Sequence, residues 1–234
     1  ALSCACWDML EGNETDEVLR NLKLSESDLW PHQIQAISQG VGILREQGSL
    51  LVADATGSGK TRTGMWLMAA ADSMVKMSQD AGTLQPDPVL VVPKAVEKEW
   101  KHNTRRELRR VPEIIGHGKI STNYKLGTYG HEILSRLNDC EVVLVDEAHN
   151  FYNDSARTRR LRTHAAQSSI LLTATPINRS FEDLLSLVEL LSQDDFDEEL
   201  ERKLRNLRKQ VYSKDRNQRT LARSAAAKLV QEFT

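Results

Sequence analysis

The segment Gly48-Ser49-Leu50-Leu51-Val52-Ala53 leads into Thr56-Gly57-Ser58-Gly59-Lys60-Thr61, and this junction decides the fold. The first part is an apolar run that predicts a short strand buried on both faces. In the second part, glycines let consecutive backbone N–H groups point into one concavity, and Lys60 begins a helix whose N-terminus carries partial positive charge. The unit predicts a phosphate-binding loop over residues 56–61, with Lys60 on the β- and γ-phosphates and the Thr61 hydroxyl on Mg²⁺. An ordinary glycine-rich turn between a strand and a helix is the alternative for this segment alone.

The composition is that of a soluble globular protein. The 234 residues are 40% apolar and 27% charged, which suits one large domain or one domain with an appendage. Cys4 and Cys6 are too close together, with no second Cys or His pair nearby, to predict a zinc site, so we expect free thiols in a reducing compartment, cytoplasmic or, in a eukaryote, nuclear. The N-terminus shows no signal pattern, and no run approaches the ~18 apolar residues of a membrane span.

Charge is distributed unevenly along the chain. Residues 1–28 hold seven Asp or Glu against two Lys or Arg, whereas residues 201–234 hold ten Lys or Arg against three acids. A basic end of this kind indicates contact with nucleic acid, but a solvated helix face has the same composition. Charge alone leaves both interpretations open.

Apolar strands alternate with helical patterns along the chain, which predicts a parallel sheet covered by helices on both faces. Three of the strands end in polar residues, at 56–61, 146–149 and 173–175, and these are expected to share the edge where such sheets bind ligands. The other predicted strands are 89–92 and, more weakly, 114–115 and 119–122. Predicted helices lie near Val18–Leu24, after Pro31, over 64–77, after Ala95, over 131–137 and over 184–191, with a last helical stripe at 200–211.

The tetrapeptide Asp146-Glu147-Ala148-His149 follows directly from a buried strand. Two adjacent carboxylates at that point are costly unless a cation balances them, and a Mg²⁺·nucleotide supplies one. Asp146 is expected to hold Mg²⁺ through water, and Glu147 to orient the attacking water. The hydroxyls of Thr173 and Thr175 can hydrogen-bond His149 and couple the hydrolytic site to whatever binds beyond it. In isolation, solvated acids in a turn at the end of a strand are as good an explanation.

Together these residues resemble the first motor lobe of superfamily-two helicases and translocases, over about Leu29 to Leu191. The loop at 57–61 is similar to motif I, Asp146-Glu147-Ala148-His149 to motif II of DEAH type, and 172–176 to motif III. Asp54 and the extended motif III, continuing through Asn178, favour the Swi/Snf-like ATPases. The resemblance implies a RecA-like P-loop NTPase lobe of α/β class, a parallel sheet with helices on both faces, and a helical C-terminal extension.

The resemblance also implies further contacts. Gln33 is expected to read the adenine, since Leu29-Trp30-Pro31-His32-Gln33 is similar to the entry motif of the family. Lys94 falls in a segment similar to motif Ia, and Thr122 lies where motif Ib would fall, so both are expected to contact the nucleic-acid backbone. Trp100 is equally consistent with such a contact and with a core aromatic on an amphipathic helix.

We expect three regions: an acidic, partly helical segment at 1–28, the ATP-binding lobe at 29–192 and a basic helical extension at 193–234. The implied cofactors are ATP and Mg²⁺, and the implied partner is duplex DNA, bound through its backbone. Motors of this kind close ATP between two lobes, and the second lobe supplies arginine fingers. No strand-rich unit follows Leu191, so we expect a lobe from a longer chain that hydrolyses ATP weakly alone.

Two alternative functions stay open. Ala55, Thr56 and Ser58 are closer to a DEAD-box loop, which would make the chain part of a DEAD/DEAH-type RNA or DNA helicase. A different class is a nucleotide-responsive scaffold that docks a partner through its basic C-terminal stripe. Lys60, Asp146 and Glu147 argue against the scaffold, because docking needs no carboxylate that activates water.

Overall fold

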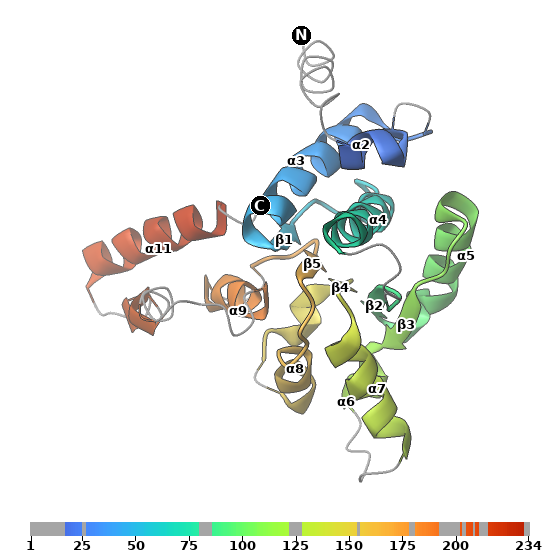
Figure 1. The fold of residues 1–234 in the computed structure, drawn as a ribbon. Helices are drawn as coiled ribbons and strands as arrows, with labels where there is room; N and C mark the ends of the chain where they lie inside the picture. Colours follow the sequence, from blue (N-terminus) through green and yellow to red (C-terminus); the bar gives the residue numbers. More distant parts are fainter. Residues whose placement is uncertain are drawn as a thin grey trace.

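A parallel sheet forms the centre of the protein (Figure 1). The computed structural model describes residues 17–24, 27–79, 86–121, 128–153, 155–177, 181–191, 202, 205–207, 209–210 and 215–231. Five strands pair in the order β1-β5-β4-β2-β3, all parallel. They are β1 (Ser49–Val52), β2 (Val89–Val92), β3 (Glu113–Gly116), β4 (Val142–Val145) and β5 (Ser168–Leu172). The predicted fold class, an α/β lobe with a parallel sheet, is confirmed.

Helices cover both faces of this sheet. In Figure 1, α2, α3, α4 and α5 lie above it, and α6, α7, α8 and α9 lie below it, with α11 beside α9. The helices below the sheet and α11 are α6 (His117–Ser121), α7 (Thr128–Asp139), α8 (Ala156–Leu161), α9 (Phe181–Leu191) and α11 (Arg216–Gln231). Those above it are α2 (Glu17–Leu22), α3 (Pro31–Gln47), α4 (Lys60–Ser78) and α5 (Glu97–Leu108), and two short 3-10 turns are η2 (Lys94–Val96) and η3 (Ala148–Phe151).

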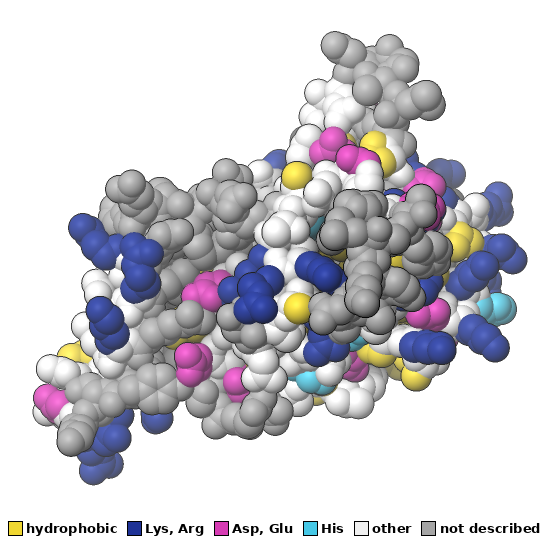
Figure 2. Space-filling view, turned by 90° about the horizontal axis from the view of Figure 1, so that it is seen from below, with side chains coloured by type: hydrophobic (Ala, Val, Ile, Leu, Met, Phe, Trp, Pro, Cys, Tyr) yellow, Lys and Arg dark blue, Asp and Glu magenta, His cyan; other side chains and the backbone are white. Residues whose placement is uncertain are grey.

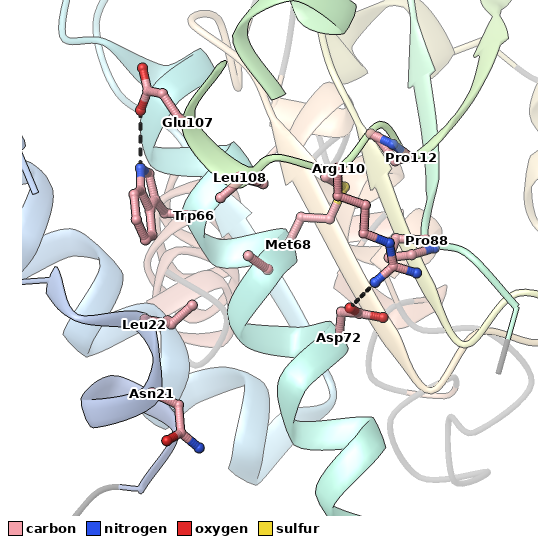
Figure 3. Close-up of a pocket in the computed structure, with 11 residues that line it drawn as sticks. Asn21, Leu22, Trp66, Met68, Asp72, Pro88, Glu107, Leu108, Arg110 and Pro112 are labelled. Carbon is pink, nitrogen blue, oxygen red and sulfur yellow. Dashed lines mark hydrogen bonds and ion pairs between the residues drawn. The ribbon is translucent and has the colours of Figure 1, made fainter. Parts of the chain in front are cut away.

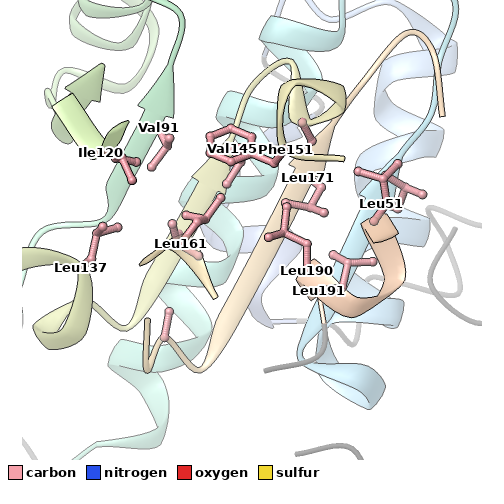
Figure 4. Close-up of a cluster of buried hydrophobic side chains, with 14 of the residues drawn as sticks. Leu51, Val91, Ile120, Leu137, Val145, Phe151, Leu161, Leu171, Leu190 and Leu191 are labelled. Carbon is pink, nitrogen blue, oxygen red and sulfur yellow. The ribbon is translucent and has the colours of Figure 1, made fainter. Parts of the chain in front are cut away.

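The core is divided in two by the sheet, because successive side chains of a strand point to opposite faces. In β1, Leu50 and Val52 join the cluster under α3 and α4, whereas Leu51 joins the cluster shown in Figure 4. The other central strands alternate in the same way, and every residue of β1, β2, β4 and β5 is buried. This two-sided burial explains why the strands are continuous apolar runs in the sequence.

One predicted element is wrong. Residues 119–122 were expected to form a strand, but Lys119–Ser121 belong to α6, which follows β3 directly. A single buried residue, Ile120, supplies the apolar signal there, and a run this short does not distinguish a strand from one helical turn. Thr122 lies outside the described residues.

The predicted region boundaries stay predictions. Val18 and Leu19 of α2 are buried in the same cluster as α3 and α4, so this part of the N-terminal segment packs on the lobe. In the predicted C-terminal extension, Ala222 of α11 is 1% exposed, and α11 contacts α9. Within the described part of the chain, none of the helices combines the length and apolar character needed to cross a membrane.

Gly40 and Gly42 of α3 allow a matched test of how α3 packs against β1 and α4, the strand and the helix on either side of the phosphate loop. A Cβ on Gly40 would lie 2.6 Å from Leu67 and 2.9 Å from Leu50, whereas a Cβ on Gly42 would meet nothing within 4 Å. We expect Gly40→Ala to lower the free energy of unfolding by about 1–3 kcal/mol through overpacking. Gly42→Ala should raise it by about 0.5–1 kcal/mol, because alanine is the better helix former. Urea unfolding measures the free energy of unfolding of both variants. Equal changes in the two variants would contradict this packing.

Candidate active site

The polar segments that follow three strands meet at one edge of the sheet. The strand order places β5 between β1 and β4, so the phosphate loop, Thr173–Thr175 and Asp146–His149 follow neighbouring strands. Backbone hydrogen bonds tie two of these ends to the sheet, from Thr173 N–H to the Val52 carbonyl (3.0 Å) and from Asp146 N–H to the Val91 carbonyl (2.9 Å). The sheet therefore brings together the three segments that the sequence pattern selected.

The backbone of the phosphate loop is shaped by two glycines. Gly57 and Gly59 have φ angles of 85° and 83°, in the left-handed region that favours glycine. A Cβ on Gly59 would lie 2.3 Å from the Gln33 side-chain nitrogen, while one on Gly57 would meet open space. The Ser58 hydroxyl oxygen is buried and has no hydrogen-bond partner among the described residues. An open glycine loop with an unused hydroxyl at the start of a long helix fits a phosphate group.

The segment before α3 supports this loop from outside. Gln33 is 3% exposed, and its side-chain oxygen accepts from the Trp30 N–H (3.0 Å) while its nitrogen donates to the Gly59 carbonyl (3.4 Å). His32 Nε2 lies 3.1 Å from the Ser58 carbonyl oxygen. The entry motif thus contacts the loop backbone directly. That Gln33 reads an adenine stays a prediction.

Lys60 and Asp146 belong to the same site. The Lys60 ammonium donates to the Ala55 carbonyl at 2.9 Å, across the mouth of the loop. Burial raises the pKa of the Asp146 carboxyl, which is 8% exposed, and the positive charge of Lys60 acts in the opposite direction. A half-buried Thr61 follows Lys60 in the first turn of α4. A carboxylate and a threonine hydroxyl beside a phosphate loop are oxygen ligands of the kind that Mg²⁺ prefers.

Every polar atom of Asp146 has a partner. Its Oδ2 accepts from the Trp100 indole N–H (2.8 Å), its Oδ1 from the Glu147 N–H (2.9 Å) and its carbonyl from His117 Nε2 (3.0 Å). Trp100 is 1% exposed, so the core interpretation of this residue is correct and a nucleic-acid contact is excluded. These contacts fix the carboxylate that the sequence assigned to the metal.

His117 is a site neighbour that sequence reasoning missed. It is 6% exposed, its ring lies edge-on to Phe151 with the centroids 4.9 Å apart, and burial lowers its pKa to about 4. The imidazole is therefore neutral near pH 7. No periodic or motif signal marks a lone histidine that follows an edge strand.

The backbone at Glu147 is unusual. Its φ and ψ are both 50°, a left-handed conformation that is uncommon for residues other than glycine, although Lys23 and Arg109 also have positive φ angles. Its carboxylate lies 3.1 Å from His149 Nδ1, which in turn lies 3.3 Å from the Thr173 hydroxyl. Thr173 also accepts from the Thr175 N–H at 3.1 Å. The structure thus joins these four residues in one chain of contacts, and the coupling role predicted for them stays a prediction.

Comparisons with known proteins show which proteins this chain is similar to. The SNF2-related domain family matches residues 120–233. Chromodomain-helicase-DNA-binding protein 1-like of Danio rerio is 24% identical over 202 residues, which are 78% of this chain and 19% of that protein. The ISWI chromatin-remodeling complex ATPase ISW1 of Saccharomyces cerevisiae is 23% identical over 188 residues, which are 72% of this chain and 16% of that protein. The Sulfolobus solfataricus SWI2/SNF2 ATPase core in complex with dsDNA has the same fold, with a TM-score of 0.66 and 18% identity over 89% of this chain and 44% of that one.

The chain is therefore similar to the Swi/Snf-like ATPases in sequence, and to one of their solved cores in fold. It spans less than a quarter of the length of the two curated relatives named above. The family match begins at residue 120 and so covers motifs II and III, while the phosphate loop lies before it.

Basic side chains lie on several parts of this lobe, and two groups lie at its opposite ends (Figure 2). Figure 2 keeps the left-to-right order of Figure 1, and its dark blue side chains gather at the right edge, where α5 lies, and around α11 at the left. On α5, Lys98, Lys101 and Arg105 are exposed and, at spacings of three and four residues, share one helix face. Lys94 is exposed on η2, at the end of β2 beside β4, so the predicted backbone contact is accessible and stays a prediction.

The lobe also has a cavity of about 280 Å³ that is separate from the candidate site (Figure 3). It lies between α2, α4 and the segments preceding β2 and β3, and no predicted site residue lines it. Its charged groups are already paired: Glu107 binds Arg62 and Trp66, and Arg110 binds Asp72. The cavity therefore contributes none of the predicted site residues, which follow the carboxyl ends of the strands.

Proposed function

We propose that the chain is the ATP-binding motor lobe of a Swi/Snf-like, ATP-dependent translocase on double-stranded DNA. One observation supports this most directly: the Lys60 loop, the buried Asp146 and the left-handed Glu147 lie at one sheet edge. Phosphoryl transfer to water needs mainly positioning and neutralisation of charge around the γ-phosphate. The residues present supply both.

Each residue has a distinct proposed role. Lys60 and the backbone of 56–61 bind the phosphates, and Thr61 and Asp146 hold the metal. Bound Mg²⁺ supplies charge neutralisation on the phosphate oxygens. Glu147, whose carboxylate is held at 3.1 Å from His149, accepts a hydrogen bond from the attacking water and orients it. His149, Thr173 and Thr175 connect that carboxylate to the segment that follows β5.

A second lobe completes the proposed site. Arginine fingers from such a lobe contribute roughly 10³–10⁵ in rate in related NTPases. We therefore expect this chain to bind Mg·ATP and to hydrolyse it slowly. Equilibrium ATP binding and phosphate release, with and without duplex DNA, test the proposal. Failure to bind ATP would refute the site, and rapid DNA-stimulated turnover by this chain alone would refute the need for a second lobe.

Duplex DNA is the proposed track, and the dsDNA in the Sulfolobus complex supports this choice. Because Lys98, Lys101 and Arg105 share an exposed face of α5 and Lys94 is exposed on the turn just before it, we place a backbone contact on α5. Replacing the three with alanine should weaken DNA binding and reduce the slope of log K against log[salt] by about 0.9 for each phosphate that the protein no longer neutralises. Fluorescence anisotropy with a labelled duplex over a salt series measures this slope.

The matched control replaces three arginines of α11, Arg216, Arg219 and Arg223, with alanine. We expect a smaller change in slope for this variant. A change confined to the α11 variant would transfer the contact to the C-terminal extension, and no change in either variant would favour the scaffold that docks a protein partner. Competition with single-stranded RNA distinguishes the translocase from an RNA helicase.

A further inference from the structure

We propose that Trp100 is a positioning residue that orients the Asp146 carboxylate toward Mg²⁺, an inference that rests on the proposed function. The indole N–H donates to Asp146 Oδ2 at 2.8 Å in a fully buried contact. Hydrogen bonds to an ionised group are among the stronger ones, and a buried carboxylate oxygen left without a partner is costly. The tryptophan therefore determines where the carboxylate points.

The two Asp146 oxygens are held from different parts of the fold. Oδ1 accepts from the Glu147 N–H of the adjacent turn, and Oδ2 accepts from Trp100 on α5. With one N–H on each oxygen, rotation of the carboxylate would break at least one hydrogen bond. Each oxygen accepts more than one hydrogen bond or ligand, so both remain able to bind a hydrated metal.

The position of Trp100 relative to the phosphate loop is also fixed. Arg62, in the first turn of α4 directly after Lys60 and Thr61, binds Glu107 of α5 at 2.8 Å. Trp66 of α4 donates to the same carboxylate at 3.2 Å, as Figure 3 shows. The Arg62 contact joins the helix that carries the lysine to the helix that carries Trp100, and it does not depend on Trp66. The indole donor and the phosphate-binding residues thus keep one relative position.

A hydrogen bond within α5 also stabilises the helix turn around Trp100. The Thr104 hydroxyl, which is fully buried, donates to the Trp100 carbonyl at 2.8 Å. The Trp100 ring itself packs in the core cluster under α3 and α4. A phenylalanine keeps most of this packing and removes only the donor, so Trp100→Phe isolates the hydrogen bond.

Trp66 offers a matched control. Its indole N–H also donates to a carboxylate, but Glu107 keeps Arg62 and Arg106 as partners when Trp66 is replaced. Hydrogen bonds from Arg62, Arg106 and Trp66 outweigh burial and lower the pKa of Glu107, so this carboxylate stays charged at neutral pH. Trp66→Phe therefore makes the same chemical change outside the candidate site.

The test is ATP affinity measured by calorimetry with excess Mg²⁺ and again with EDTA. The ratio of the two Kd values is the gain in affinity that depends on magnesium. Trp100→Phe should reduce this gain roughly tenfold, the size of effect seen when groups that orient metal ligands are removed, and leave the Kd in EDTA unchanged. Trp66→Phe should change neither value. An unchanged gain in Trp100→Phe would overturn the proposal.

Asp146→Asn separates this inference from the proposed function. If Asp146→Asn leaves the magnesium-dependent gain intact, the metal assignment itself fails. If Asp146→Asn abolishes the gain while Trp100→Phe retains it, only the positioning role fails.

A second measurement uses the wild-type protein, so it does not require a Trp100 variant that folds. In protein labelled with ¹⁵N-tryptophan and saturated with ATP in EDTA, adding Mg²⁺ should shift the Trp100 indole N–H resonance and leave that of Trp66 in place. A Trp100 resonance that does not respond to Mg²⁺ would overturn the proposal.

Discussion

Replacing Lys60 with alanine is expected to raise the Kd for Mg·ATP by about 100-fold, because a charged donor to the phosphates contributes about 1.5–3 kcal/mol. Lys60 is the first residue of α4 and its ammonium lies across the phosphate loop, on the Ala55 carbonyl. The substitution removes no core contact, so the lobe should keep its unfolding temperature. Isothermal titration with Mg·ATP measures the effect directly.

The control for this prediction lies on the same helix. Lys76, near the C-terminal end of α4, is paired with Asp72 and lies far along the helix from the loop. Lys76→Ala should leave the Kd for Mg·ATP at the wild-type value. A Lys60→Ala protein that binds Mg·ATP as tightly as the wild type would show that the loop is not the phosphate site.

Glu147→Gln is expected to lower the rate of ATP hydrolysis by about 10²–10⁴-fold while leaving the Kd for Mg·ATP nearly unchanged, since a neutral amide oxygen accepts a weaker hydrogen bond than a carboxylate and polarises the attacking water less. The amide preserves the shape of the side chain and leaves the left-handed backbone at this position in place. Slow hydrolysis by the isolated lobe can be followed with radiolabelled ATP over long incubations, with the protein in excess.

A glutamate before the same strand provides the comparison. Glu141 directly precedes β4, and Glu147 lies beyond its other end. Glu141→Gln should therefore hydrolyse ATP at the wild-type rate. Equal rates for Glu147→Gln and the wild type would remove Glu147 from the catalytic role, even if Lys60→Ala behaves as expected. Together the two substitutions separate nucleotide binding from water activation.

Much of the fold could be predicted from local pattern. Runs such as Val89–Val92 and Val142–Val145 are apolar throughout because helices cover both faces of the sheet. Gly48 ends α3 in the left-handed conformation, as the position of this glycine before an apolar run indicates. The strand predicted at 119–122 was wrong because one buried isoleucine gives no periodicity.

The candidate site was only partly predictable. Lys60, Asp146 and Glu147 were recognisable because a glycine loop and a pair of acids after buried strands are rare combinations with a specific chemical use. The partners of Asp146 were not recognisable. Trp100 lies 46 residues away in sequence and His117 lies 29 away, and each meets the carboxylate residue through long-range packing.

By itself, then, the sequence determined which residue types could bind a nucleotide and the alternation of strands and helices, because glycine conformation, lysine charge and apolar periodicity act over a few residues. Only the tertiary structure decided the strand order β1-β5-β4, which brings three remote loops to one edge. It also decided that an indole from α5 faces Asp146. The order of parallel strands and the direction of a buried donor depend on how whole helices cross the sheet, and no local pattern encodes that crossing.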